Sequence, residues 1–242
     1  MNAFMPLVSV TLRGLLGRRR LALMLLLVAL PVGLALLVRL GGGGRNDASG
    51  ILDTLVIRTV LPLVALVLGT AALGSEIDDG TIVHLLVKPI ARRWIIFATA
   101  VVAAGLTAAL CVPSVILTGL LTSGLGSASV TTTFAFAAAV LAGGTAYTIV
   151  FMALSTVTSR ALVIGLVYTL IWEGVIAGLL EGTRFLSIRQ ATLGVAAGLG
   201  GERPGSEPLD PVMSVAILVV ATVGALLIAT RQLARFEVRG GD

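Results

Sequence analysis

The sequence predicts an all-α, polytopic membrane protein with six transmembrane helices, and three observations lead to this fold class. Hydrophobic residues make up 57% of the 242-residue chain and charged residues only 12%. Mean hydropathy is +1.07, whereas a soluble protein of ordinary composition carries about 25% charged residues. The apolar residues form long uncharged runs with arginines near their ends, as bilayer-crossing helices do. We therefore expect lipid to cover most of this chain.

Residues 1–20 are predicted to form an interfacial helix. Arginines at positions 13 and 18–20 supply a charged face, and such a helix lies in the headgroup plane. Its apolar residues recur at helical spacing: Phe4, Leu7, Val8, Leu12, Leu15 and Leu16. A twin-arginine signal is the alternative, but the apolar run that follows has no small-x-small cleavage site. That run predicts the first span, over about 21–40, with Pro31 as a kink.

Five further spans follow from the uncharged runs. The second covers about 52–74 and contains Arg58. No charged residue occurs from 94 to 159; this length fits two spans, about 93–121 and 133–156, with the polar stretch 122–133 as their turn. The fifth span, about 161–180, contains Glu173, and the sixth covers about 211–230. The loop 181–210 is charged and Gly-rich, and the sequence leaves open whether its apolar part, 185–199, is re-entrant.

Charge asymmetry orients this single transmembrane domain, which takes in residues 1–242. Six spans place both termini on one side of the membrane. Eleven basic residues lie on that side and five on the other, with Arg58 inside a span. Because cytoplasmic loops carry the excess of Lys and Arg, we expect both termini in the cytoplasm.

The densest charge cluster, 76–93, lies between the second and third spans. Acidic residues at its start suit a helix N-terminus, an apolar stripe follows, and Pro89 ends the helix. The sequence thus predicts a short amphipathic helix over about 77–87. The acidic residues are Glu76, Asp78 and Asp79, and the stripe is Ile82, Leu85 and Leu86. A solvated anchor between two spans and a docking element for a soluble partner both remain open.

Residue counts exclude several kinds of chemistry. The single lysine, Lys88, precedes a proline rather than Ser or Thr, so the chain has no phosphate-binding loop. One cysteine, Cys111, and one histidine, His84, cannot form a multi-Cys or His-His metal site. Aromatic residues are sparse, at 5%, which argues against a base-stacking surface for nucleic acid. We expect no catalytic residue, metal or cofactor in this chain.

The loop and the topology together resemble an ABC-2 type transporter permease. In that family the first cytoplasmic loop has a Glu, then Gly-Thr, a Leu-Leu pair, Pro and Arg. This sequence has Glu76, Gly80-Thr81, Leu85-Leu86, Pro89 and Arg92. The resemblance extends to the basic N-terminal helix, the six spans and the loop between spans five and six.

The resemblance implies a half-transporter in a bacterial plasma membrane. Two permeases pair, most often for export, and each contacts a separate ATPase subunit that binds ATP and Mg. The helix at 77–87 would be the coupling helix. The residues expected to contact the ATPase are Glu76, Asp78, Asp79, Gly80, Thr81, Leu85, Leu86, Pro89 and Arg92. The substrate, and whether the pair is a homodimer or a heterodimer, do not follow from the sequence.

Three other functions compete with this one. A secondary carrier or channel would line its path with ionisable groups or broken helices, and these are few here. A membrane-embedded assembly subunit would transport nothing itself. A phospholipid headgroup transferase is suggested by Asp78-Asp79-Gly80, but the further aspartates that a divalent cation needs do not follow it.

Arg58 and Glu173 are the two charges placed most clearly inside spans. By helical rise, Arg58 lies about 24 Å and Glu173 about 18 Å from the cytoplasmic ends of their spans. Both then fall in the outer half of the bilayer, where a lone charge costs about 2.5–3.5 kcal/mol. We expect them to face each other or the dimer cavity; the alternative is that Arg58 snorkels outward and Glu173 meets water.

Overall fold

The computed structural model describes residues 14–15, 17–41, 50–78, 92–123, 127–176, 181–201 and 209–235. Every regular element in these ranges is helical. Five helical segments are long and apolar enough to cross a membrane. The elements are α2 (Arg18–Leu40), η1 (Leu52–Val60), α4 (Leu61–Asp78), α6 (Arg92–Ser123), α7 (Ser127–Val157), α8 (Ala161–Val167), η2 (Tyr168–Ile176), η3 (Glu181–Leu186), α10 (Ile188–Gly198) and α11 (Pro211–Arg235).

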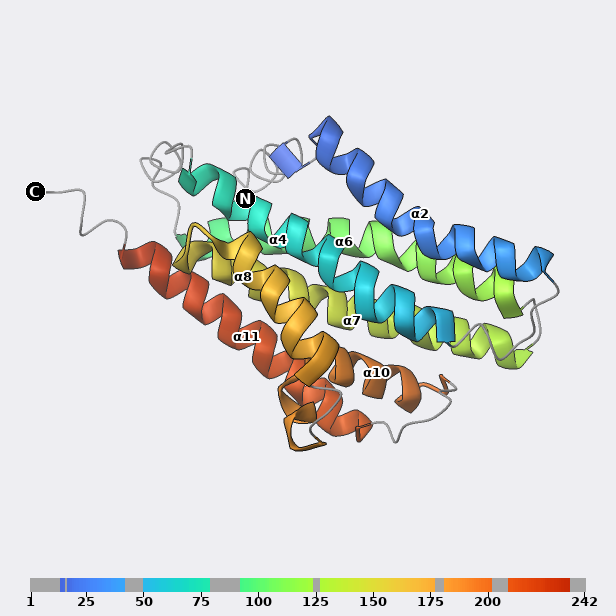
Figure 1. Cartoon of the computed structure of the whole chain (residues 1–242). Helices are drawn as coiled ribbons and strands as arrows, with labels where there is room; N and C mark the ends of the chain where they lie inside the picture. The colour runs from blue at the N-terminus through green and yellow to red at the C-terminus, as the bar shows by residue number, and fades with distance from the viewer. Residues whose placement is uncertain are drawn as a thin grey trace, which may run out of the picture.

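Helix α7 is the centre of the bundle and packs against α4, α6, α10 and α11 (Figure 1). Small and hydroxyl-bearing residues bring the helices close. A Cβ on Gly69 of α4 would lie 2.5 Å from the Thr148 carbonyl oxygen of α7. The hydroxyls of Thr107 on α6 and Thr148 are 2.8 Å apart and hydrogen-bonded. Close approach through small residues, with hydrogen bonds between helices, is the usual way that helices associate in lipid.

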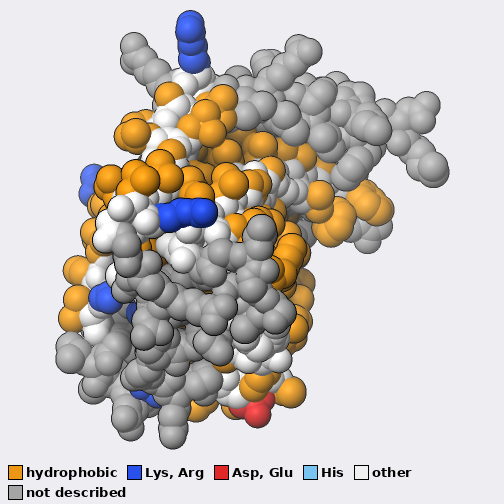
Figure 2. All heavy atoms as spheres, turned by 90° about the vertical axis from the view of Figure 1, so that its right-hand side faces the viewer, with side chains coloured by type: hydrophobic (Ala, Val, Ile, Leu, Met, Phe, Trp, Pro, Cys, Tyr) orange, Lys and Arg blue, Asp and Glu red, His pale blue; other side chains and the backbone are white. Residues whose placement is uncertain are grey.

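Helices α2 and α11 lie at the periphery and present apolar side chains outward. In the most apolar 18-residue stretch of each helix, 17% of the residues are buried in α2 and 22% in α11, whereas 67% are buried in α7. Helix α2 packs along α6, where the Ser114 hydroxyl donates to the Val28 carbonyl oxygen at 2.7 Å. Hydrophobic side chains form much of the coloured surface in Figure 2. Such a surface fits a hydrocarbon environment.

Most of the expected spans coincide with observed helices. The first, third, fourth and sixth correspond to α2, α6, α7 and α11. The turn expected at 122–133 is shorter, because α6 continues to Ser123 and α7 begins at Ser127. The threonines at 131–133 are therefore helical residues. The expected interfacial helix at 1–20 lies almost wholly outside the described residues, and α2 already begins at Arg18.

The second span extends further than expected. It consists of the π-helix η1 followed by α4, and α4 continues past residue 74 to Asp78. The backbone at Glu76 and Asp78 therefore belongs to the end of this helix and not to the start of a new one. Neither Gly74 nor Ser75 breaks the helix, since a single glycine weakens a helix by only about 1 kcal/mol. The rest of the expected coupling helix, 79–87, lies outside the described residues.

The fifth expected span differs most from expectation. Its apolar helical part, Ala161–Val175, is too short to count among the five membrane-length segments, so the count of six full-length spans is not confirmed. Fifteen residues rise about 22 Å, against a hydrocarbon core of about 30 Å. The segment comprises α8 and the π-helix η2. Beyond it, α10 packs against α7, α11 and η1, and eight of its eleven residues are buried; part of the loop 181–210 thus folds back onto the bundle.

Candidate functional site

Both charges expected inside spans lie in π-helical segments. Arg58 lies in η1 and Glu173 in η2, and each of these segments has nine residues. Asp53 is a third charged residue in η1. π-Helical turns are rare, and they occur frequently at functional sites. Both segments lie next to α10, which makes this region the candidate site.

Glu173 is buried, with 3% of its surface exposed, and hydrogen-bond donors from α7, η2 and α10 surround its carboxylate. Tyr147 of α7 and Tyr168 of η2 donate their hydroxyls to it, the latter at 3.2 Å. The backbone N–H of Arg189 in α10 donates at 3.3 Å. Burying an unpaired carboxylate is costly, and hydrogen bonds to the charged form offset that cost. One acidic side chain thus connects η2, α7 and α10.

The first turn of α10 is satisfied by two acceptors. Ser187 is the N-cap residue, and its hydroxyl oxygen accepts from the Gln190 N–H at 3.2 Å. Glu173 accepts from the Arg189 N–H, as described above. The first N–H groups of a helix have no partner within the helix, and a carboxylate there is also favoured by the helix dipole. Glu173 therefore acts as a second cap supplied by another part of the chain.

An ion pair holds the same turn of α10 to η1. Arg189 Nη2 lies 3.2 Å from Asp53 Oδ1, and the two side chains are 10% and 19% exposed. A pair this buried adds little net stability, but removing one partner leaves the other charge uncompensated. The pair therefore fixes where α10 packs, together with Glu173.

Arg58 and Glu173 do not face each other as an ion pair. The Arg58 side chain is exposed, and its Nη2 donates to the carbonyl oxygen of Gly174 at 2.6 Å. Glu173 takes its donors from elsewhere. The physical reason is that a charged guanidinium forms a strong hydrogen bond to a backbone carbonyl, and Arg58 takes such an acceptor in η2. Arg58 thus binds the residue next to Glu173 in sequence, but the two charged side chains meet different partners.

Sequence reasoning missed four members of this cluster: Asp53, Tyr147, Tyr168 and Arg189. One signal for the tyrosines was available. The chain has two tyrosines, both inside expected spans, and a buried tyrosine hydroxyl usually needs a hydrogen-bond partner. Glu173 shares its expected span with Tyr168, so it was an available acceptor for a tyrosine hydroxyl. Asp53 and Arg189 lie 136 positions apart, and no local pattern connects them.

The structure describes only the backbone of three of the residues expected to contact an ATPase. The backbones of Glu76 and Asp78 end α4, and Arg92 begins α6. The others lie outside the described residues: Asp79, Gly80, Thr81, Leu85, Leu86 and Pro89. Among the residues that the structure describes, no group of three or more His, Cys, Asp or Glu could hold a metal ion.

Comparison with known families identifies the class of protein. The family described as ABC-2 family transporter protein matches residues 16–179, which is 164 of 242 residues (179 − 16 + 1). A comparison with curated proteins found no match. The match includes both π-helical segments and the 76–93 region, and it ends before α10. Because it covers well over half of the chain, and the helices have the length and apolarity of membrane spans, the protein belongs to the ABC-2 family of transporter proteins.

Proposed function

We propose that this chain is the permease subunit of an ATP-binding cassette exporter in a bacterial plasma membrane, with both termini in the cytoplasm. Two permeases, either two copies or two related chains, form the path. Separate cytoplasmic ATPase subunits bind ATP and Mg and drive transport. The observation that carries this proposal is the family match over residues 16–179, which includes the whole region expected to couple to the ATPase.

The arrangement of α4 and α6 supports coupling through 77–87. These two helices pack against each other, and Figure 1 shows the end of α4 and the start of α6 at the same end of the bundle. The segment 79–91 therefore joins two helices that pack against each other. A partner that pushes on this loop would move both helices, whose other contacts include the central helix α7.

Co-purification tests the proposal. The chain carries an affinity tag and is co-expressed with an ABC ATPase from the same genome. We expect the ATPase to co-purify, because an amphipathic helix binds a groove through its apolar face. Replacing Leu85 and Leu86 together by Ala should weaken this association, since truncating a central anchor costs about 1–4 kcal/mol. In the same double variant, the ATP hydrolysis that the permease stimulates in the ATPase subunit should also fall.

The matched control replaces two leucines on an exposed face of α2. Leu26 and Leu37 are 67% and 66% exposed, and the variant with both changed to Ala should retain the ATPase. Equal association of both double variants with the ATPase would refute docking through 77–87. Substrate flux in reconstituted vesicles that needs an ion gradient and no ATP would favour a secondary carrier instead.

A further inference from the structure

An apolar groove of about 490 Å³ runs between α7, α8 and α11. Val150 and Leu154 form its α7 wall, Ile164 and Tyr168 the opposite wall, and Val220 and Ile228 the α11 wall. The groove differs from the polar cluster, because its lining side chains are hydrophobic over almost their whole length. Tyr168 belongs to both: its ring lines the groove and its hydroxyl binds Glu173. Through Tyr168 the groove therefore borders the polar cluster.

The length of the groove matches one leaflet of a bilayer. From Val220 to Ile228, α11 rises about 12 Å at 1.5 Å per residue. Half of a hydrocarbon core is about 15 Å. Gly224 lies midway along this wall, and a Cβ built on it meets no atom within 4 Å. The groove therefore has the length and the free width for an acyl chain lying along the helices.

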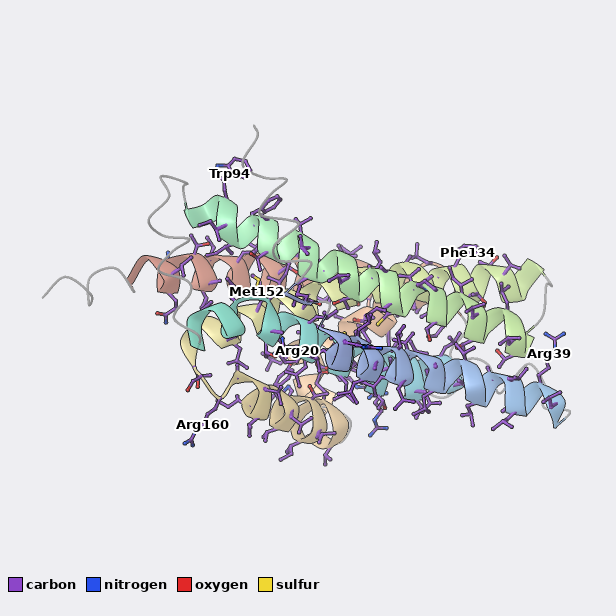
Figure 3. The ribbon with its side chains drawn as sticks, turned by 90° about the horizontal axis from the view of Figure 1, so that it is seen from above. Arg20, Arg39, Trp94, Phe134, Met152 and Arg160 are labelled. Atoms are coloured by element: carbon purple, nitrogen blue, oxygen red, sulfur yellow. The ribbon has the colours of Figure 1, made fainter. Side chains whose placement is uncertain are left out.

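Two arginines lie a few residues in sequence from the lining residues Ile164 and Ile228. Arg160 immediately precedes α8, four residues before Ile164, and Arg231 follows Ile228 by three residues on the same face of α11. Both side chains are exposed, and Figure 3 shows Arg160 projecting from the end of its helix away from the ribbons. The acidic side chains whose placement is described, Asp53, Glu173 and Asp210, belong to the α10 end. The described charge at this end is thus positive.

We propose that this groove binds one anionic phospholipid, with an acyl chain between α7, α8 and α11 and the phosphate at Arg160 and Arg231. Apolar lining alone would accept any lipid. The two arginines select an anionic headgroup, because each basic residue near the surface favours anionic lipid by about fivefold. The lining of the groove contains none of the residues expected to contact the ATPase subunit.

Native mass spectrometry tests the site. The full chain is reconstituted in vesicles of phosphatidylglycerol and phosphatidylcholine in equal amounts with identical acyl chains, then released in mild detergent. The wild type should retain one phosphatidylglycerol in preference to phosphatidylcholine. Arg160→Gln with Arg231→Gln should lower this preference by about fivefold for each arginine. Arg20→Gln with Arg39→Gln, two exposed arginines of α2, is the charge-matched control and should keep it.

A second variant fills the groove without changing charge. Gly224→Leu places a side chain in the open space and should abolish retention of both lipids. Gly33→Leu on α2, where a Cβ also meets no atom within 4 Å, should retain them. Size-exclusion profiles confirm that each variant is folded. Equal retention of the two lipids by the wild type would overturn the proposal. So would a Gly224→Leu variant that keeps its lipid, or one that splits an oligomer while lipid retention is unchanged, which would make the groove a protein interface.

Discussion

Glu173 illustrates how a charge is accommodated inside this bundle without an opposite charge beside it. Its carboxylate is buried and accepts from two tyrosine hydroxyls and one backbone N–H. Neutral donors that point at a carboxylate from fixed positions stabilise the charge. Every donor comes from a helix that packs in the bundle, so the carboxylate has a structural task. We therefore assign Glu173 to the positioning of α10 rather than to the lining of a path.

At this scale the first prediction concerns the coupling between Glu173 and Tyr147. Tyr147→Phe removes a buried donor, and Glu173→Gln removes the charge; each should lower thermal stability in detergent by about 1–3 kcal/mol. The double variant should lose clearly less than the sum, because the two changes remove one shared interaction. Thermal unfolding of all four proteins measures this. A strictly additive double variant would contradict the hydrogen bond.

The pair Arg58 and Glu173 is the matched comparison. Arg58 donates to the Gly174 carbonyl and Glu173 accepts from other groups, so Arg58→Gln and Glu173→Gln should act almost additively. Recovery of stability in this double variant would instead indicate a direct ion pair. Both double-variant comparisons contain Glu173→Gln. They differ only in whether Tyr147 or Arg58 is the second residue changed.

Among the elements, α10 lies beyond the family match and is held by polar contacts to two segments within it. The Asp53–Arg189 ion pair and the Glu173 cap join it to η1 and η2. Asp53→Asn should therefore loosen α10 without disturbing the central helices, because it leaves the Arg189 charge without this partner. Hydrogen exchange should show faster exchange of the amides at 188–198 and unchanged exchange in α6.

A second carboxylate gives the control for that experiment. Asp210 Oδ1 accepts from the N–H groups of Val212 and Met213 at 2.7 and 3.2 Å, so it caps α11. Asp210→Asn should affect only the first turn of α11, since an N-cap acts locally. If Asp53→Asn and Asp210→Asn gave the same exchange pattern, the change would reflect general loosening and not release of α10.

The contact between α4 and α7 carries another prediction at the scale of elements. Gly69→Ala places a Cβ 2.5 Å from a backbone oxygen of α7, and backbone cannot move aside as a flexible side chain can. The two central helices must then separate, which should cost about 1–3 kcal/mol. Gly105→Ala on α6 meets nothing within 4 Å and should be neutral or slightly stabilising. Thermal unfolding compares the two; equal stability would contradict the close packing.

For the whole molecule, the sequence predicted what depends on apolar length and missed what depends on long-range contacts. Helices α2, α6, α7 and α11 each contain an uncharged run long enough to cross most of a bilayer, and length alone identifies these runs. The π-helical segments and α10 follow from partners distant in sequence, such as Asp53 with Arg189. Short apolar segments with polar residues are ambiguous by pattern alone. The charges of the site were found, but their partners were not.

The path of the short fifth segment decides the topology. Figure 1 shows α8 starting at the end of the bundle where α11 finishes, while α10 lies toward the other end. The chain thus advances along the bundle through α8 and η2 and returns through α11, although Ala161–Val175 is short. Near its end Glu173 is buried, and protein donors satisfy its carboxylate, as polar groups at that depth require.

Two single-cysteine variants test this path. In a Cys111→Ala background, Ser206→Cys should react with an impermeant maleimide in intact cells, and Ser9→Cys should react only after the membrane is opened. Cys111 is buried in the bundle, so its replacement should leave the helix arrangement unchanged. Six crossings place the loop 181–210 and the N-terminus on opposite sides. Labelling of both cysteines from the same side would mean that α8 and η2 do not carry the chain across the membrane. The proposal that α10 lies toward the outer side would then be wrong.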